Sequence, residues 1–177
     1  MSNNTNGSVP SKTGELLSLI RRLCGFPKNP SQKGGLRPKD VKYLVVHCSA
    51  TKPSMDVGAA DIDRWHRKNG WRKIGYHFVI KRDGTIEPGR EPTEIGAHAA
   101  GYNSVSIGIC LVGGVSEKDV NKAENNFTIS QMETLHRLLS YLLATSFPKA
   151  KVLGHRDLPG VKKACPSFDV QKWFYGS

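Results

Sequence analysis

The sequence lacks the features that define several large protein classes. It contains no apolar run near the roughly 20 residues that a membrane-spanning helix needs. Its first residues, MSNNTNGSVPSK, have neither the apolar core nor the cleavage pattern of a secretory signal. The four cysteines are scattered without a CxxC pair, which argues against a zinc finger and against a disulfide framework. We therefore expect a globular protein that is first held in a cytoplasm.

Acidic residues are also scarce in this chain. Its 177 residues include 15 acidic and 26 basic residues, so the formal net charge is +11. Residues 1–42 hold eight basic and two acidic residues, a net charge of +6. Such an excess favours a polyanionic partner, which could be nucleic acid, anionic lipid or bacterial cell wall. The plain alternative is a basic surface that only keeps the protein in solution.

The composition of the chain changes near residue 40, which divides it into two parts. Residues 1–40 are predicted to form a basic extension, in which ELLSLIRRLCG has helical apolar spacing and the Gly/Pro/Lys-rich residues 25–40 form a linker. The helix could contact an anionic membrane surface or pack on its own domain. Residues 41–177 are predicted to form the main domain.

Short strands and helices alternate in residues 41–177. We expect buried strands in KYLVVHCSA, SIGICLVGG and KVLG, and a hairpin around Asp83-Gly84. Helices are expected in VGAADIDRWHRKNG and in TISQMETLHRLLSYLLAT, where Thr128 and Gln131 form a capping box. SFDVQKWF is expected to form a terminal helical turn. This order predicts a single α/β domain with a mixed central β-sheet and helices packed on it.

Two histidines follow short strands, and a cysteine lies ten residues after the second of them. The residues are His47, His155 and Cys165, the last two in GHRDLPGVKKACPSFD. Cys165 could be a buried thiol, a nucleophile paired with His155, or a metal ligand. Catalytic zinc takes three protein ligands from histidine, cysteine and carboxylates and leaves one position for water. The pattern alone leaves all three interpretations open.

Four segments of the chain resemble the type-2 N-acetylmuramoyl-L-alanine amidases, and most closely their phage lysozyme subgroup. They occur in the family's order between Val41 and Trp173: HCSATKP, GWRKIGYHFVIKRDGTIEPGR, GAHAAGYNSVSIGICLVGG and KKACPSFD. Residues 1–40 lie outside the resemblance. It implies the fold shared by these amidases and the peptidoglycan-recognition proteins.

The resemblance also implies a set of site residues. It implies one Zn2+ per chain, with His47, His155 and Cys165 as its ligands, and Tyr76 and Lys163 as catalytic side chains. No glutamate is identified as a general base. His98 lies in a Gly/Ala-rich loop, GAHAAGYN, that would let a ligand approach, so we expect it to contact substrate, although an ordinary loop histidine would look the same.

The function that the resemblance implies is that of an endolysin. Such a zinc amidase cleaves the amide bond between N-acetylmuramic acid and the L-alanine of the stem peptide of peptidoglycan, and it stays in the host cytoplasm until lysis. Relatives called peptidoglycan-recognition proteins can lack the metal cysteine, so a non-catalytic binding module is the alternative. Phage relatives also inhibit a phage RNA polymerase, which makes that polymerase a second candidate partner. We expect a monomer.

Overall fold

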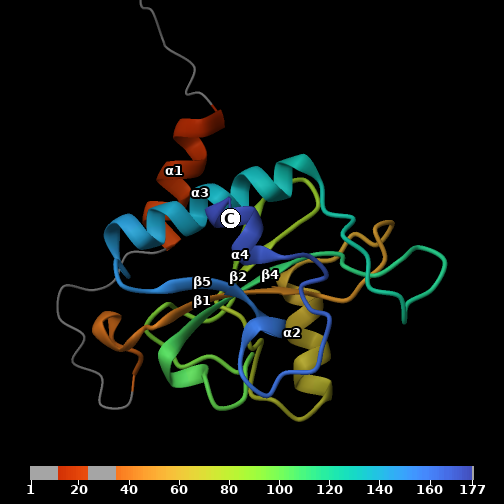
Figure 1. Cartoon of the computed structure of the whole chain (residues 1–177), viewed down its shortest axis with the longest axis horizontal. Coiled ribbons are helices and arrows are strands. Elements are labelled where there is room, and N and C mark those ends of the chain that lie inside the picture. Colours follow the sequence, from red (N-terminus) through yellow and green to blue (C-terminus); the bar gives the residue numbers. More distant parts are fainter. Residues whose placement is uncertain (1–11, 24–34, 177) are drawn as a thin grey trace, which may run out of the picture.

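The computed structural model describes residues 12–23 and 35–176, which fold around one mixed five-stranded sheet (Figure 1). The strand order is β3-β2-β4-β1-β5, and only β3 runs antiparallel to its neighbour. The strands are β1 (Tyr43–Cys48), β2 (Phe78–Ile80), β3 (Ile86–Pro88), β4 (Ser106–Leu111) and β5 (Lys151–Gly154). The mixed α/β sheet predicted from the sequence is therefore confirmed.

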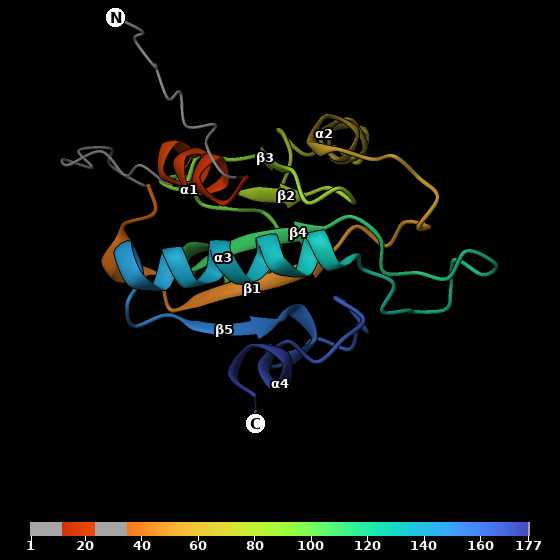
Figure 2. The same cartoon turned by 90° about the horizontal axis from the view of Figure 1, so that it is seen from above.

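Helices cover both faces of the sheet. The α-helices are α1 (Lys12–Leu23), α2 (Ala59–Lys68), α3 (Ile129–Thr145) and α4 (Val170–Tyr175). Three short 3-10 helices connect elements: η1 (Pro38–Asp40), η2 (Asn103–Val105) and η3 (His155–Asp157). Helices α1, α3 and α4 lie on one face and α2 on the other (Figures 1 and 2). In the described ranges, no helix has the length and apolar character that a membrane span requires.

The central strands are buried on both faces because each face has its own apolar cluster. In β1, Leu44 and Val46 join the cluster under α1 and α3, whereas Val45 faces a smaller cluster with Leu153. All four side chains are at most 8% exposed. This explains why these strands read as continuous apolar runs instead of alternating patterns.

The predicted capping box at the start of α3 is confirmed. Thr128 Oγ1 accepts a hydrogen bond from Gln131 N, and Gln131 Oε1 accepts one from Thr128 N. The Gln131 amide also donates to the backbone oxygens of Ile80 and Val112, which lie on β2 and just after β4. The cap therefore fixes α3 to the sheet as well as to its own first turn.

Helix α1 shares the main core instead of standing apart from it. Ile20 is fully buried in the same cluster as Leu36 and the α3 leucines, and α1 lies beside α3 over the sheet (Figure 2). Arg21 and Arg22 are exposed. The side chains of Leu16 and Leu17 and the predicted linker up to residue 34 lie outside the described residues. The described apolar contacts of the helix are thus directed at its own domain.

Replacing Ile20 by alanine is expected to lower the free energy of unfolding by about 2–5 kcal/mol, the usual cost of truncating a buried isoleucine. Urea denaturation followed by circular dichroism measures this. Arg21→Ala is the matched control on the exposed side, with an expected change within about 0.5 kcal/mol. Equal stability of the two variants would show that α1 is not part of the cooperative core.

Candidate metal centre and groove

Two neighbouring parallel strands bring His47 and His155 to the same edge of the sheet. Val46 of β1 pairs with Gly154 of β5, so the residues that follow them lie side by side. Their ring centroids are 4.5 Å apart. His47 is buried at 1% exposure, while His155 is half-buried at the start of η3. The register of two strands therefore accounts for the first pair of the predicted site.

The loop after η3 returns Cys165 to this pair. Arg156 N donates to Cys165 O at 2.9 Å, and Ser167 Oγ donates to Gly114 O at 2.7 Å, which fixes the loop on both sides of the thiol. Cys165 Sγ lies 3.9 Å from His47 Nδ1 and accepts from the backbone N–H of Cys48 at 3.3 Å. A backbone donor directed at sulfur stabilises negative charge there.

The three side chains fit a metal ion by geometry and by chemistry. One ligand atom from each of His47, His155 and Cys165 can be chosen so that all lie within 4.8 Å of one another. Two imidazoles and a thiol are a donor set that zinc accepts, with one position left for water or substrate. Burial, and then the neighbouring His98, His155 and Lys163, lower the pKa of His47, so its imidazole is neutral as a metal ligand must be.

Cys165 does not have the surroundings of an activated nucleophile. The neighbouring Cys48 thiol and burial raise the pKa of the Cys165 thiol above its ordinary value. Reactive cysteines usually show the opposite shift, whereas a metal ion itself deprotonates the thiol that ligates it. Cys165 Sγ also lies 3.9 Å from Nδ1 of His47, whereas the nucleophile hypothesis paired it with His155.

Tyr76 lies beside the donor set, as the resemblance implied. Its ring centroid is 5.1 Å from that of His47. Arg90 N donates to Tyr76 O, and a side chain on Gly89 would come within 2.2 Å of that oxygen, so close backbone packing fixes the residue. Burial raises the pKa of Tyr76, which keeps its hydroxyl protonated and able to donate.

Lys163 lies on the same loop as Cys165 and is exposed. Burial and then the charge of Lys163 lower the pKa of His155. Lys163 also lines a groove of about 470 Å³ that passes over His155. The structure therefore brings together all five predicted metal and catalytic side chains.

The groove includes one residue of the donor set, His155. Its other lining residues are Trp71, residues 97–100, Asn103 and residues 159–163. Trp71 is 42% exposed, which is unusual for so large an apolar side chain. Trp71 was not among the predicted site residues, although an aromatic residue directly after the Asn69-Gly70 turn is a recognisable signal for an exposed ring.

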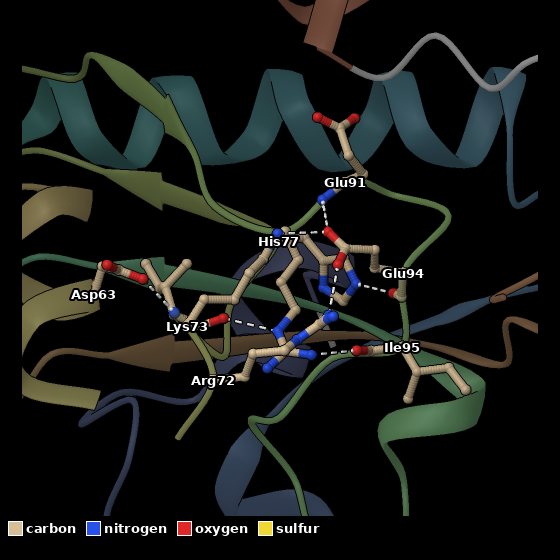
Figure 3. Close-up of polar contacts among 9 residues, drawn as sticks. Asp63, Arg72, Lys73, His77, Glu91, Glu94 and Ile95 are labelled. Atoms are coloured by element: carbon tan, nitrogen blue, oxygen red, sulfur yellow. Dashed lines mark hydrogen bonds and ion pairs between the residues drawn. The ribbon is translucent and has the colours of Figure 1, made fainter. Parts of the chain in front are cut away.

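A polar network anchors the loop that carries Trp71 (Figure 3). Glu94 accepts from Arg72 at 3.0 Å and from Lys73 at 2.7 Å. Arg90 donates to the backbone oxygens of Ile74 and Ile95, both at 2.7 Å. Three of these four contacts join residues 16 to 22 positions apart, so sequence spacing alone does not reveal them.

His98 lines the groove, but it also has a partner that the sequence did not predict. Its side chain is 8% exposed. His98 Nδ1 lies 2.9 Å from His47 Nε2, on the side of His47 that faces away from Cys165. The contact with substrate stays a prediction.

The buried side chain of His77 lies behind that of His98. Its Nδ1 accepts from Gly108 N at 3.0 Å, and its Nε2 donates to Glu94 O at 2.9 Å. Burial lowers the pKa of His77 to about 4 from 6.5. Below pH 6.5 the His77 imidazole becomes protonated in the unfolded chain but stays neutral in the folded chain. The contribution of the neutral His77 to stability is therefore fully present above pH 6.5 and is lost as the pH falls toward 4.

We expect His77→Asn to weaken the pH dependence of stability in that window. Asn Oδ1 can still accept from Gly108 N, but the residue no longer titrates. Between pH 6.5 and 4.5 wild type should lose about 2–3 kcal/mol more than the variant, at about 1.4 kcal/mol per pKa unit. Urea titrations at the two pH values measure this difference, and parallel losses in the two proteins would contradict it.

The fold and site define a class that contains peptidoglycan amidases and peptidoglycan-recognition proteins. The endolysin amidase LysCS of Clostridium intestinale URNW superposes with a TM-score of 0.60 and 29% identity, covering 81% of this chain and 86% of that one. The peptidoglycan recognition protein-LE, solved in complex with tracheal cytotoxin (monomeric diaminopimelic acid-type peptidoglycan), gives a TM-score of 0.60 and 25% identity over 82% of this chain and 85% of that one.

Sequence comparison identifies the family within this class. The model of the N-acetylmuramoyl-L-alanine amidase family matches residues 37–168. The endolysin of Escherichia phage T7 is 50% identical over 131 residues, which cover 74% of this chain and 83% of that protein. The chain belongs to the N-acetylmuramoyl-L-alanine amidase family and is an amidase of the phage endolysin type. The resemblance drawn from the sequence is thereby confirmed.

Proposed function

We propose that this amidase depends on zinc and that it lyses the bacterial host by cutting the bond between N-acetylmuramic acid and L-alanine in peptidoglycan. The observation that carries the zinc dependence is the donor set itself: His47 converges within 4.8 Å with His155 and Cys165, which lie more than 100 residues later in the chain. One of the three, His155, also lines a groove that a substrate can enter.

The side chains around the donor set have distinct roles in this proposal. His47, His155 and Cys165 hold one Zn2+, which when bound supplies Lewis acidity toward a carbonyl and toward water. The protonated hydroxyl of Tyr76 and the ammonium group of Lys163 stabilise the negative charge that develops on the amide oxygen of the substrate. Because a thiolate ligand adds negative charge to the centre, Lys163 contributes more here than it would beside three neutral imidazoles.

In this proposal no aspartate or glutamate acts as the general base. The groove residues of the described chain include lysines, histidines and an asparagine, but none of them is acidic. This agrees with the absence of a candidate glutamate in the sequence.

Peptidoglycan is the substrate that both the groove and the relatives favour. Trp71 offers a flat apolar wall, and Lys162 and Lys163 offer positive charge to the acidic groups of a stem peptide. The overall charge of +11 favours contact with an anionic wall. In this proposal the protein stays in the host cytoplasm until lysis and acts on the wall after release.

The remaining partners stay predictions from the sequence. Contact of residues 1–40 with an anionic membrane would use the exposed Arg21 and Arg22, since Ile20 is buried in the core. Inhibition of a phage RNA polymerase and the monomeric state rest on the resemblance alone. A non-catalytic binding module is disfavoured, because Cys165 completes the donor set.

Digestion of purified peptidoglycan tests the proposed reaction. New alanine amino termini are expected without new reducing sugars, and a chelator should abolish their formation until Zn2+ is restored. New reducing ends without amino termini would make the protein a glycosidase. Activity that resists a chelator but is lost on thiol alkylation would favour a cysteine nucleophile.

A further inference from the structure

The imidazole of His47 has two different neighbours on its two nitrogens. Nδ1 faces Cys165 Sγ at 3.9 Å and thus belongs to the donor set. Nε2 lies 2.9 Å from His98 Nδ1, with the two rings in an edge-on arrangement at 5.0 Å. A ring that offers Nδ1 to a metal carries its proton on Nε2, so His47 must donate and His98 must accept.

The hydrogen bonds of His98 and Ser106 are consistent with the same direction of donation. When His98 accepts at Nδ1, its own proton is on Nε2, which lies 3.4 Å from Ser106 Oγ. The Ser106 hydroxyl donates in turn to Tyr102 O at 2.8 Å. The chain of donors therefore ends on a backbone oxygen, and each group donates once in the same direction.

The position of the His98 ring is built into the fold. A side chain on Gly108 or on Gly96 would come within 2.5 Å of His98 Cδ2, so these two glycines form a slot for the ring. Asn103 Oδ1 accepts from His98 N at 2.8 Å and from Ala99 N at 2.9 Å, which fixes the backbone. The slot leaves the ring only 8% exposed.

We propose that His98 is a positioning residue of the metal centre: by accepting the Nε2 proton of His47 it fixes the tautomer and the orientation of that ligand. The inference rests on the proposed zinc site. Metal-bound histidines generally donate their second ring N–H to a fixed acceptor, and loss of such a partner lowers metal affinity about 10–100-fold. Both nitrogens of His98 are engaged within the protein, which distinguishes this role from a polar contact with substrate.

Zinc affinity of the whole chain, measured by competition with a chromophoric chelator, tests the proposal. His98→Leu removes the acceptor and should weaken zinc binding about 10–100-fold. His98→Asn places Oδ1 where Nδ1 was and should bind within about threefold of wild type. His136→Gln, on α3 beside Trp173 and Phe174, is the histidine control and should bind as wild type does. In the Co2+-substituted proteins, the visible bands should shift for His98→Leu only.

The outcomes separate this proposal from its alternatives. Wild-type zinc affinity in a folded His98→Leu protein, with only KM for peptidoglycan raised, would overturn it in favour of substrate contact. A second measurement needs no variant: NMR of the zinc-loaded wild type should show a scalar coupling across the hydrogen bond from His47 Nε2 to His98 Nδ1. A proton on His47 Nδ1 would overturn the proposal. Absence of zinc binding by wild type would refute the proposed function itself, and the wild-type titration alone reveals it.

Discussion

Replacing Cys165 by serine is expected to reduce the rate of amide hydrolysis by about 10³-fold or more and to remove the bound metal. Serine keeps the size of the side chain but replaces a thiolate with a hydroxyl that zinc binds poorly. A Lewis acid at a carbonyl contributes several kcal/mol to the transition state, and about 1.4 kcal/mol corresponds to a factor of ten. Release of alanine amino termini and metal content per chain should therefore fall together.

Cys48→Ala is the matched control for that variant. Cys48 lies next to Cys165 and contributes its backbone N–H, which alanine retains. Zinc content and rate should stay within a few-fold of wild type. His47→Ala separates the mechanisms further, because a Cys165–His155 nucleophilic pair does not need His47. An active His47→Ala protein, or a Cys165→Ser protein that keeps its metal and its rate, would contradict the zinc account.

The second large loss of activity is expected on replacing either of the two side chains that contact the substrate oxygen in the proposed mechanism. Tyr76→Phe and Lys163→Ala should each lower kcat by about 10²–10³-fold, the usual effect of removing one such donor, while zinc stays bound. Neither residue is in the donor set, so metal affinity distinguishes these variants from Cys165→Ser. Steady-state kinetics on soluble muropeptides, with metal analysis of the same samples, measures both quantities.

Lys162→Ala is the control for Lys163→Ala. Both lysines are exposed on the same loop and line the same groove, so a general loss of positive charge would affect the two variants alike. The proposed mechanism expects a large loss of kcat only at Lys163. Full activity of Lys163→Ala would remove this residue from the mechanism and leave Tyr76 as the remaining donor.

The sequence predicts those parts of the fold that depend on local patterns. Apolar runs mark the strands that end near His47 and at Gly154, and an Asp-Gly pair marks the hairpin. The Thr128/Gln131 capping box marks the start of α3, and each of these features is present in the structure. Because parallel strands present their carboxyl ends at one edge, the pairing of His47 with His155 also follows from local signals.

The rest of the site depends on contacts between distant residues, which no spacing reveals. Cys165 reaches the histidines because Ser167 bonds to Gly114, more than 50 positions earlier. His98 is aligned by a slot between two glycines of different segments, so from sequence it looked like a loop residue. The resemblance supplied the ligand set, and the structure supplies the reason why these side chains meet.

Titration of the metal-free protein with Zn2+ tests the central claim most directly. Release of alanine amino termini from peptidoglycan should be absent at the start, rise linearly with added Zn2+ and stop rising at one equivalent per chain. Full activity of the metal-free protein, or a rise without a break near one equivalent, would contradict the account.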